Sequence, residues 1–182
     1  MVGHKKYLYQ YVFYFTADQF PLLIQQNIGG SSLFNRSWAQ YKVGFSDDRN
    51  NFWIGNEVLS QLTIHGRHKL RFDLQLRSNL SWYWAEYSSF LVLGEATNYT
   101  MLISGYSGNI GDALRYHTYV MFSTYDRDND AGSSNCAADF GGGFWYKNCS
   151  WCGVNAVRNS FQWVHPSVTT HNLQTSRMWL MY

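Results

Sequence analysis

Strict alternation of apolar and polar residues between positions 69 and 76 is the feature that most constrains the fold of this chain. Leu70, Phe72, Leu74 and Leu76 alternate with Lys69, Arg71, Asp73 and Gln75. Side chains on a β-strand point alternately to its two faces, so this pattern predicts a strand with one buried face. A half-buried strand of this kind is typical of an antiparallel sheet.

Further strands and one helix are predicted around this strand. The helix covers residues 56–62, where Asn56 is a suitable N-cap, Leu59 and Leu62 share one face, and Gly66 follows the end. The other predicted strands cover residues 24–27, 89–93, 99–103 and 177–182. Together these elements predict an α+β fold, an antiparallel meander with a helix packed against it.

Composition indicates one folded domain and excludes two classes of function. The 182 residues are 46% hydrophobic and only 14% charged, which is ample for one core. A net charge of +2 without a block of basic residues argues against nucleic-acid binding. No apolar run approaches the roughly 18–20 residues of a membrane span. Residues 7–15 follow Lys5 and Lys6 and are either a secretion signal or an ordinary apolar segment.

An acidic loop at residues 126–136 is the strongest candidate for a functional site. Its sequence is Asp-Arg-Asp-Asn-Asp-Ala-Gly-Ser-Ser-Asn-Cys. Alternating carboxylates followed by small residues can direct side-chain and backbone oxygens at one point, as Ca²⁺ requires. The same residues are also typical of a solvated turn. An EF-hand is excluded, because Ala131 and Ala137 stand where that loop needs glycine and glutamate.

No pattern in the chain indicates an enzyme. The G-x-S-x-G, H-E-x-x-H, P-loop and dinucleotide motifs are missing. His65 and His68 lie three residues apart and either share a metal or, as we expect, are surface residues. Cys149 and Cys152 form a C-x-x-C pattern, which is either a redox or zinc site or leaves Cys152 as a spare thiol, free or paired with another chain.

Four Asn-x-Ser/Thr triplets favour an extracellular setting, because they are acceptors for N-linked glycans. They begin at Asn35, Asn79, Asn98 and Asn148.

A series of short motifs occurs in the order and near the spacing of one known family. The motifs are Tyr41 to Phe45, Asn51 to Asn56, Tyr106 to Gly108, Gly111 to Leu114, Phe122 to Thr124, Asp126 to Asp130, Asn135 to Ala137, and Gly142 to Tyr146. The series resembles the fibrinogen-like domain of fibrinogen chains, ficolins, tachylectins, angiopoietins and tenascins. The resemblance covers residues 24–182 and leaves residues 1–23 as a divergent N-terminal segment.

The resemblance implies a subdivision and a metal site. Residues 24–115 would form the central sheet subdomain, residues 116–176 the calcium and ligand lobe, and residues 177–182 a strand that returns to the sheet. The implied Ca²⁺ ligands are the carboxylates of Asp128 and Asp130 and the backbone carbonyls of Gly132 and Ser134. Asp126 would orient the loop or be solvated.

The resemblance also implies a disulfide between Cys136 and Cys149 and an acetyl-binding pocket beside the calcium loop. In lectin members the pocket floor is the peptide bond before the second cysteine, often in the cis form, which here is Asn148–Cys149. Phe140 occupies a wall position. Phe144 and Trp145 lie nearby in the sequence and are either further wall residues or core.

Two departures set this chain apart from the sugar-binding members. Ser150 stands where they often have histidine, and residues 151–156 replace their usual loop, so that Phe161 is reached several residues early. The wall of the ligand pocket is therefore expected to be rebuilt, that is, formed by other residues than in the sugar-binding members. The calcium-binding loop is expected to be intact.

The resulting expectation is a secreted, non-catalytic recognition domain that binds acetylated glycans in innate pattern recognition, stabilised by Ca²⁺. A single pocket binds weakly, so several copies would act together, through self-association of the domain itself. The alternative is a protein–protein ligand or extracellular-matrix module that binds a cell-surface receptor. A third interpretation, a degenerate copy without function, follows from the divergent first 23 residues.

Overall fold

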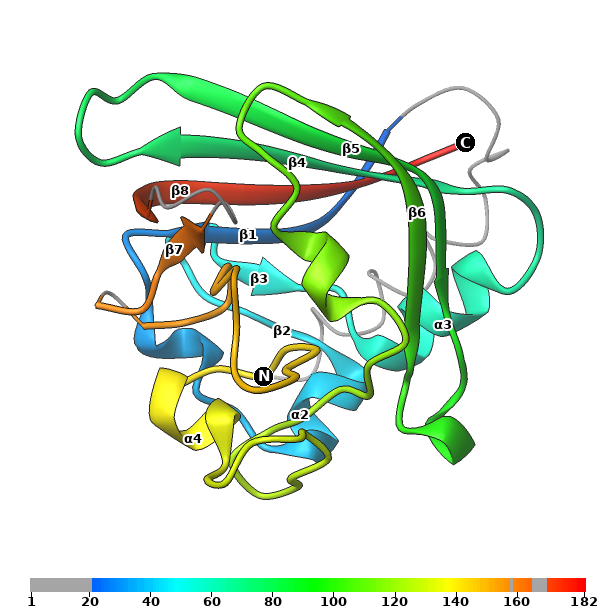
Figure 1. The fold of residues 1–182 in the computed structure, drawn as a ribbon. Coiled ribbons are helices and arrows are strands. Elements are labelled where there is room, and N and C mark those ends of the chain that lie inside the picture. Colours follow the sequence, from blue (N-terminus) through cyan, green and yellow to red (C-terminus); the bar gives the residue numbers. More distant parts are fainter. Residues whose placement is uncertain (1–20, 158, 165–169) are drawn as a thin grey trace.

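The computed structural model describes residues 21–157, 159–164 and 170–182, which form an antiparallel sheet with short helices and long loops beneath it (Figure 1). The strands are β1 Leu22–Ile28, β2 Phe45–Ser46, β3 Phe52–Trp53, β4 Lys69–Leu76, β5 Trp82–Val92, β6 Met101–Gly108, β7 Gln162–Val164 and β8 Thr170–Met181. The α-helices are α2 Trp38–Val43, α3 Asn56–Thr63 and α4 Cys136–Phe140. The 3-10 helices are η1 Ser32–Phe34, η2 Glu95–Thr97 and η3 Leu114–His117. The predicted α+β class is confirmed.

The C-terminal strand β8 lies in the middle of the sheet. The strand order is β2-β3-β1-β8-β4-β5-β6, and β7 pairs with β8 outside this path. Leu180 on β8 lies opposite Leu22 on β1 and opposite Leu70 on β4. The predicted return to the central sheet is thus confirmed. The predicted start at residue 177 is wrong, because the first part of β8 is mostly polar and pairs partly with β7.

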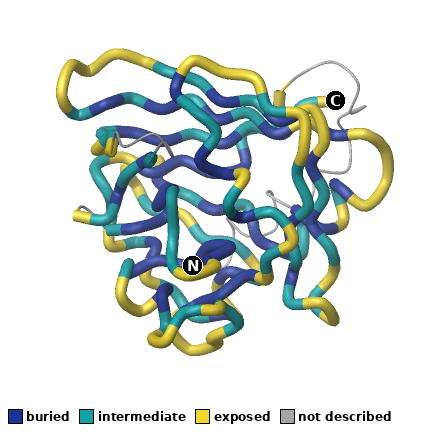
Figure 2. Tube along the Cα trace, viewed as in Figure 1, coloured by how far each residue is buried: buried dark blue, intermediate teal, exposed yellow. Residues whose placement is uncertain are grey.

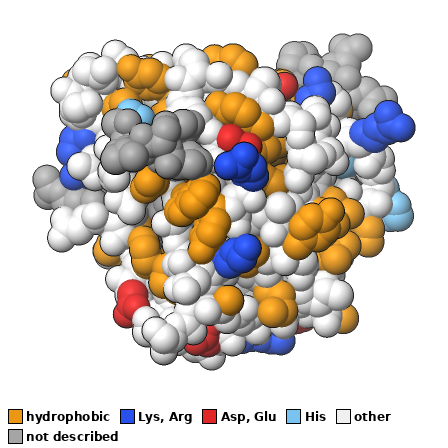
Figure 3. Space-filling model, viewed as in Figure 1, with side chains coloured by type: hydrophobic (Ala, Val, Ile, Leu, Met, Phe, Trp, Pro, Cys, Tyr) orange, Lys and Arg blue, Asp and Glu red, His pale blue; other side chains and the backbone are white. Residues whose placement is uncertain are grey.

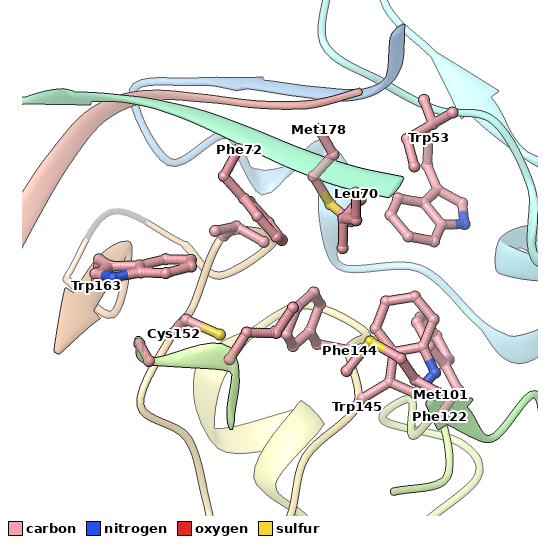
Figure 4. Packing of buried hydrophobic residues seen from close by; sticks show 14 of the residues in the cluster. Trp53, Leu70, Phe72, Met101, Phe122, Phe144, Trp145, Cys152, Trp163 and Met178 are labelled. Carbon is pink, nitrogen blue, oxygen red and sulfur yellow. The ribbon is translucent and has the colours of Figure 1, made fainter. Parts of the chain in front are cut away.

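The core lies between the inner face of the sheet and the loops beneath it. All four apolar residues of β4 are buried, which confirms the predicted half-buried strand. From the sheet side, Phe72 and Met178 point toward Phe144 and Trp145 of the lobe (Figure 4). Figure 2 shows how burial varies along the chain, with buried residues along the middle of the strands and exposed ones at the hairpin tips.

The outer face of the sheet explains why β5 begins earlier than predicted. The guanidinium group of Arg71 lies 5.1 Å from the ring centre of Trp84, and that of Arg177 lies 4.8 Å from the ring centre of Trp82. Aromatic side chains therefore occupy outward positions of β5, covered by an arginine from the adjacent strand β4 and one from β8 beyond it. Because aromatic rings stand on both faces of β5, apolar and polar residues do not alternate clearly along its first part. The sequence therefore predicts only the end of this strand, at residues 89–93.

Strand β6 also differs from its prediction at residues 99–103. Tyr99 precedes the strand, in a turn at φ 51°, and its side chain is fully buried. The strand continues instead to Gly108 through mostly exposed, small and polar residues. Because small and polar residues predominate in this edge strand, its sequence shows no alternation of apolar and polar residues from which the strand could be predicted.

Helix α3 is confirmed with its predicted start at Asn56 and ends one residue later, at Thr63, but its N-cap is a different residue. Gly55 is the N-cap and makes no side-chain capping hydrogen bond, whereas Asn56 is already helical. The Asn56 Oδ1 atom instead accepts a hydrogen bond from Trp53 Nε1 at 2.9 Å. The predicted capping role of Asn56 is therefore wrong, because its side chain is used to hold the buried indole.

The predicted secretion signal at residues 7–15 and most of the 1–23 segment lie outside the described residues. Among the residues that are described, no helix has the length and apolar character needed to cross a membrane.

Candidate functional site

The acidic loop is anchored to helix α2 through Asp126. The helix begins with a capping box, in which Ser37 accepts from the Gln40 backbone N–H and the Gln40 side chain accepts from the Ser37 N–H. Asp126 Oδ1 accepts a hydrogen bond from the Trp38 backbone N–H at 2.9 Å and one from the Thr124 hydroxyl at 2.8 Å. Asp126 thus orients the loop, one of the two roles considered for it.

Asp130 ties the loop to the start of helix α4. Its Oδ1 atom accepts from the Gly132 N–H at 2.7 Å, and its Oδ2 atom accepts from the Cys136 N–H at 2.9 Å. Asp128 Oδ1 accepts from the Asp130 N–H at 3.1 Å. The two carboxylates are therefore held close together at the turn between the loop and α4.

This turn carries oxygen donors of the kind that a hard cation takes, and two of them lie close to Gly132. A Cβ atom placed on Gly132 would lie 2.9 Å from Asp130 Oδ1, 3.0 Å from the Ser134 carbonyl oxygen and 3.1 Å from Cys136 Sγ. Partial burial, together with the neighbouring Asp128 charge, raises the pKa of Asp130, although hydrogen bonds from Cys136 and Gly132 oppose the shift. Carboxylate and carbonyl oxygens are the ligands that Ca²⁺ takes.

A calcium site here would depend on backbone carbonyls as well as carboxylates. Within the described ranges, no group of three or more His, Cys, Asp and Glu side chains is placed to hold a metal ion. The four predicted ligands, Asp128, Asp130, Gly132 and Ser134, lie in one continuous stretch of the chain shortly before helix α4. The calcium assignment itself stays a prediction.

The disulfide joins the acidic loop to the predicted pocket floor. Cys136 and Cys149 are bonded, with their Cα atoms 5.6 Å apart and a sequence separation of 13. The Asn148–Cys149 peptide bond is cis. The Ala131 N–H also donates to the Lys147 carbonyl oxygen at 2.8 Å. Two separate links therefore hold the segment around Cys149 against the acidic loop.

The two polar groups of the Cys149 backbone differ in whether they have a hydrogen-bond partner among the described residues. The Cys149 carbonyl oxygen accepts from the Lys147 N–H at 3.0 Å, but no described residue accepts a hydrogen bond from the Cys149 N–H. Phe140, at the end of α4, is half-buried and its ring centre lies 5.5 Å from that of Tyr146. Phe144 and Trp145 are fully buried and belong to the core, not to a pocket wall (Figure 4).

A stacked aromatic pair beside Asn148 was missed by the sequence analysis. The rings of Tyr116 and Trp151 are 4.5 Å apart with an interplanar angle of 14°. The Tyr116 hydroxyl donates to the Asn148 carbonyl oxygen at 2.9 Å, and Lys147 Nζ lies 5.2 Å from the Tyr116 ring centre. Figure 3 shows hydrophobic side chains exposed beside single basic ones on the face that presents the lobe. No local sequence pattern marks this pair.

His117 fixes the backbone under this pair. Its Nδ1 lies 2.7 Å from the Trp145 carbonyl oxygen, and its Nε2 lies 3.1 Å from the Trp151 nitrogen. A neutral ring that donates from Nδ1 and accepts at Nε2 satisfies both contacts. Full burial lowers the pKa of His117 to about 4, so the neutral form prevails near pH 7.

The remaining cysteine and histidine predictions are corrected by burial. Because Cys149 is bonded to Cys136, no C-x-x-C site forms, and Cys152 is free and fully buried, which also prevents pairing with another chain. Burial raises the pKa of its thiol. His68 is buried, contrary to the expectation of surface histidines, and its Nε2 lies 2.7 Å from the His65 carbonyl oxygen.

The rebuilt segment after Ser150 turns into the core. Val154, Asn155 and Ala156 are fully buried. Gln25 on β1 donates to the Val154 carbonyl oxygen at 3.0 Å and to Asn155 Oδ1 at 2.9 Å. Trp151 is consequently the last residue of this segment that contributes surface beside Cys149.

Comparison with known proteins identifies the family. The family model described as "Fibrinogen beta and gamma chains, C-terminal globular domain" matches residues 5–181, and the chain belongs to this family. The match includes most of the segment set apart as residues 1–23, so family similarity begins before residue 24. The finer subdivision at residues 115, 116 and 176 stays a prediction.

The relatives are fibrinogen-like proteins of several kinds. Tenascin from Gallus gallus is 37% identical over 155 residues, which is 82% of this chain and 8% of tenascin. Human ficolin-3 is 39% identical over 136 residues, which is 74% of this chain and 45% of ficolin-3. The chain thus spans less than half the length of these two relatives. The family comprises recognition and binding domains.

Solved structures agree with the fold. The fibrinogen-like globe domain of human ANGPTL6 superposes with a TM-score of 0.81 at 30% identity, covering 88% of this chain and 77% of that one. A lamprey fibrin D-dimer complexed with the peptide Gly-His-Arg-Pro-amide has a TM-score of 0.76 at 26% identity, covering 88% of this chain and 60% of that one.

Proposed function

We propose that this chain is a non-catalytic, calcium-stabilised recognition domain that works outside the cell and binds the acetyl groups of glycans, as in innate pattern recognition. The observation that carries the proposal is the role of Cys136. Its N–H donates to Asp130 and its sulfur is bonded to Cys149, so Cys136 links the acidic loop to the residue that follows the cis peptide bond. Family membership and the four glycosylation triplets support the extracellular setting.

The calcium ion would be structural. Asp128 and Asp130 would supply carboxylate oxygens, and Gly132 and Ser134 would supply backbone carbonyls. The ion would neutralise two neighbouring carboxylates that otherwise repel each other, and so stabilise the turn that leads into α4.

The ligand site is centred on Cys149, with Asn148 and Phe140 beside it. The unpaired Cys149 N–H is a suitable donor for an acetyl carbonyl oxygen, and the half-buried ring of Phe140 is suitable for contact with an acetyl methyl group. Pockets of this kind combine a few fixed polar groups with apolar walls.

Retention on an acetylated sugar resin tests the proposal. The protein, produced without N-linked glycans, is applied in calcium to N-acetylglucosamine resin and, as a matched control, to glucosamine resin, which lacks the acetyl group. We expect retention on the first resin only, with release by free acetate or by a chelator. Equal behaviour on both resins, from folded protein that responds to calcium, would contradict acetyl recognition.

A second candidate, a protein–protein ligand or matrix module for a cell-surface receptor, is supported by a specific observation. Ser150 replaces the expected histidine, and the half-buried Trp151 of the rebuilt segment stacks on Tyr116. Aromatic residues are enriched at protein–protein interfaces. Binding to cells that is abolished by protease treatment and survives glycosidase treatment would favour this candidate, whereas the opposite result favours the glycan proposal.

Avidity is part of both candidates. A weak single site gains useful affinity when several copies engage one surface. Sedimentation analysis with and without calcium would show whether this domain associates with itself.

A further inference from the structure

The triplet Asn148-Cys149-Ser150 places a glycosylation acceptor on the candidate ligand site itself. Ser150, the residue that departs from the sugar-binding members, is also the residue that completes the triplet. Asn148 precedes Cys149 directly, and its carbonyl oxygen accepts a hydrogen bond from the Tyr116 hydroxyl. A sugar on the Asn148 side chain would therefore begin within one residue of the free Cys149 N–H.

The four acceptor asparagines differ in how their side chains are held. The Asn98 carboxamide is engaged at both ends, by Arg127 Nη2 at 2.7 Å from Oδ1 and by Met121 Sδ at 3.2 Å from Nδ2. Asn79, at the β4–β5 hairpin tip, accepts from the Ser81 N–H at 3.0 Å. Asn35 and Asn148 are both exposed, and no hydrogen bond to either side chain occurs within the part of the chain that the structure describes. Of these two, only Asn148 lies beside Cys149.

The surroundings of Asn148 suit an attached sugar. Tyr116 and Trp151 stack in a half-buried pair next to it, and Lys147 lies against the Tyr116 ring. One face of the Tyr116 ring lies on Trp151 and Lys147 lies over the ring, so the area left for the amphipathic ring of a hexose is the part of this half-buried pair that stays exposed. A glycan on Asn148 can thus leave the folded surface without displacing a side-chain hydrogen bond and lie over the candidate site.

We infer that Asn148 is an N-glycosylation site whose glycan covers the candidate ligand site, and this inference rests on the extracellular setting proposed above. In the transfer, a bond forms between Asn148 Nδ2 and C1 of the first N-acetylglucosamine. The bond between that C1 and the phosphate oxygen of a lipid-diphosphate-linked oligosaccharide breaks, the lipid diphosphate leaves, and the amide loses one proton to solvent. The secretory pathway supplies the oligosaccharide donor and the transferase.

The modification must precede folding of this turn. In the folded chain, the Ser150 hydroxyl donates to the Cys152 carbonyl oxygen at 2.6 Å and accepts from the Cys152 N–H at 3.1 Å. Cys149 is also committed to the disulfide. The acceptor triplet is therefore available to a transferase only before these contacts close.

Peptide mapping of the protein secreted from eukaryotic cells tests the attachment. We expect the peptide containing Asn148 to carry a hexosamine-based glycan in the wild type and in Ser150→Thr, and to lose it in Ser150→Ala and in Asn148→Gln. The mass of each variant that loses the glycan should be lower than that of the wild type by about the mass of one glycan. An unmodified Asn148 overturns the inference. An occupied Asn79 in the same sample would show that the transferase had acted on this chain, so that the failure would concern Asn148 alone.

Resin retention tests the covering effect. Secreted wild type and Ser150→Thr are expected to pass through N-acetylglucosamine resin, whereas Ser150→Ala from the same cells is retained. The control is the same pair made with glycosylation inhibited, in which both proteins should be retained equally. Retention of fully glycosylated wild type would overturn the covering role, and failure of every form to bind would instead contradict the acetyl-binding proposal.

Discussion

The backbone N–H of Cys136 donates to Asp130 Oδ2 at 2.9 Å, and this contact connects the acidic loop to the first turn of helix α4. The same cysteine is bonded to Cys149, which follows the cis peptide bond. A change in the acidic loop therefore has a short physical route to the candidate ligand site.

Asp130→Asn is expected to abolish stabilisation by calcium. The amide keeps the shape of the carboxylate but removes its charge, which Ca²⁺ binding requires. Calcium at about 100 times its Kd stabilises a folded protein by ~2.7 kcal/mol, or about 5–10 °C in Tm for a chain of this size. Thermal melting with calcium and with chelator measures the difference.

The matched control for this variant is Asp48→Asn, which removes one exposed carboxylate from a turn outside the acidic loop. It should keep the full calcium-dependent shift. An unchanged shift in Asp130→Asn would show that calcium, if it binds, does so elsewhere.

His117 is expected to make the free energy of unfolding depend on pH below neutrality. Its pKa is lowered to about 4 in the folded chain, while the unfolded chain keeps the usual value of 6.5. Between these values only the unfolded state takes up the proton, so stability is full above pH 6.5 and falls as the pH drops toward 4. The loss is on the order of 3 kcal/mol.

Denaturant unfolding of the wild type and of His117→Asn across this pH range measures the effect, at a fixed chelator concentration so that calcium does not contribute. The variant should be less stable at pH 7 and show a flatter pH profile. Parallel profiles for the two proteins would assign the pH dependence to other groups.

Cys152 is expected to be unreactive in the folded protein. Its thiol is fully buried and its pKa is raised by burial, so neither exposure nor thiolate formation favours attack. A thiol reagent should label no cysteine under native conditions and one after unfolding without reductant.

Mass spectrometry of non-reduced peptides gives the matching result for the disulfide, which should join Cys136 to Cys149. A peptide pair joined through Cys149 and Cys152, or rapid labelling of the native protein, would contradict the arrangement described here.

Tyr116→Phe is expected to weaken the turn around Asn148 modestly. The variant keeps the ring stacked on Trp151 but loses the hydroxyl bond to the Asn148 carbonyl oxygen, a contact open to water, at a cost of about 0.5–1 kcal/mol. Tyr116→Ala also loses the stacked ring and should cost more.

Equilibrium unfolding of the two variants provides the comparison, and retention on the acetylated resin shows whether the turn matters for binding. Equal stability of Tyr116→Phe and Tyr116→Ala would mean that the stacked pair contributes nothing to this turn.

Local patterns predicted those parts of the fold in which one face of an element differs from the other. The alternation in β4 and the leucine spacing in α3 are examples, and both elements were placed correctly. The start of β5 was missed because aromatic rings stand on both of its faces. The first residues of β8 were missed because a central strand can be polar where it pairs with β7.

The candidate site was predictable only where the family motifs reach. They indicated the Cys136–Cys149 pair and the unusual peptide bond before Cys149. They gave no sign of the Tyr116–Trp151 stack, which joins segments distant in sequence, or of the buried position of Cys152. Such contacts arise from the packing of the whole lobe, and no local spacing encodes them.

Binding of a polymer that carries N-acetylglucosamine, measured across a calcium titration, tests the central claim most directly. For the wild type without its glycans, we predict that bound polymer rises with calcium over the same concentrations that raise Tm. For Asp130→Asn, we predict weak binding that calcium does not change. Strong binding by both proteins at every calcium concentration would contradict a link between the acidic loop and the ligand site through Cys136.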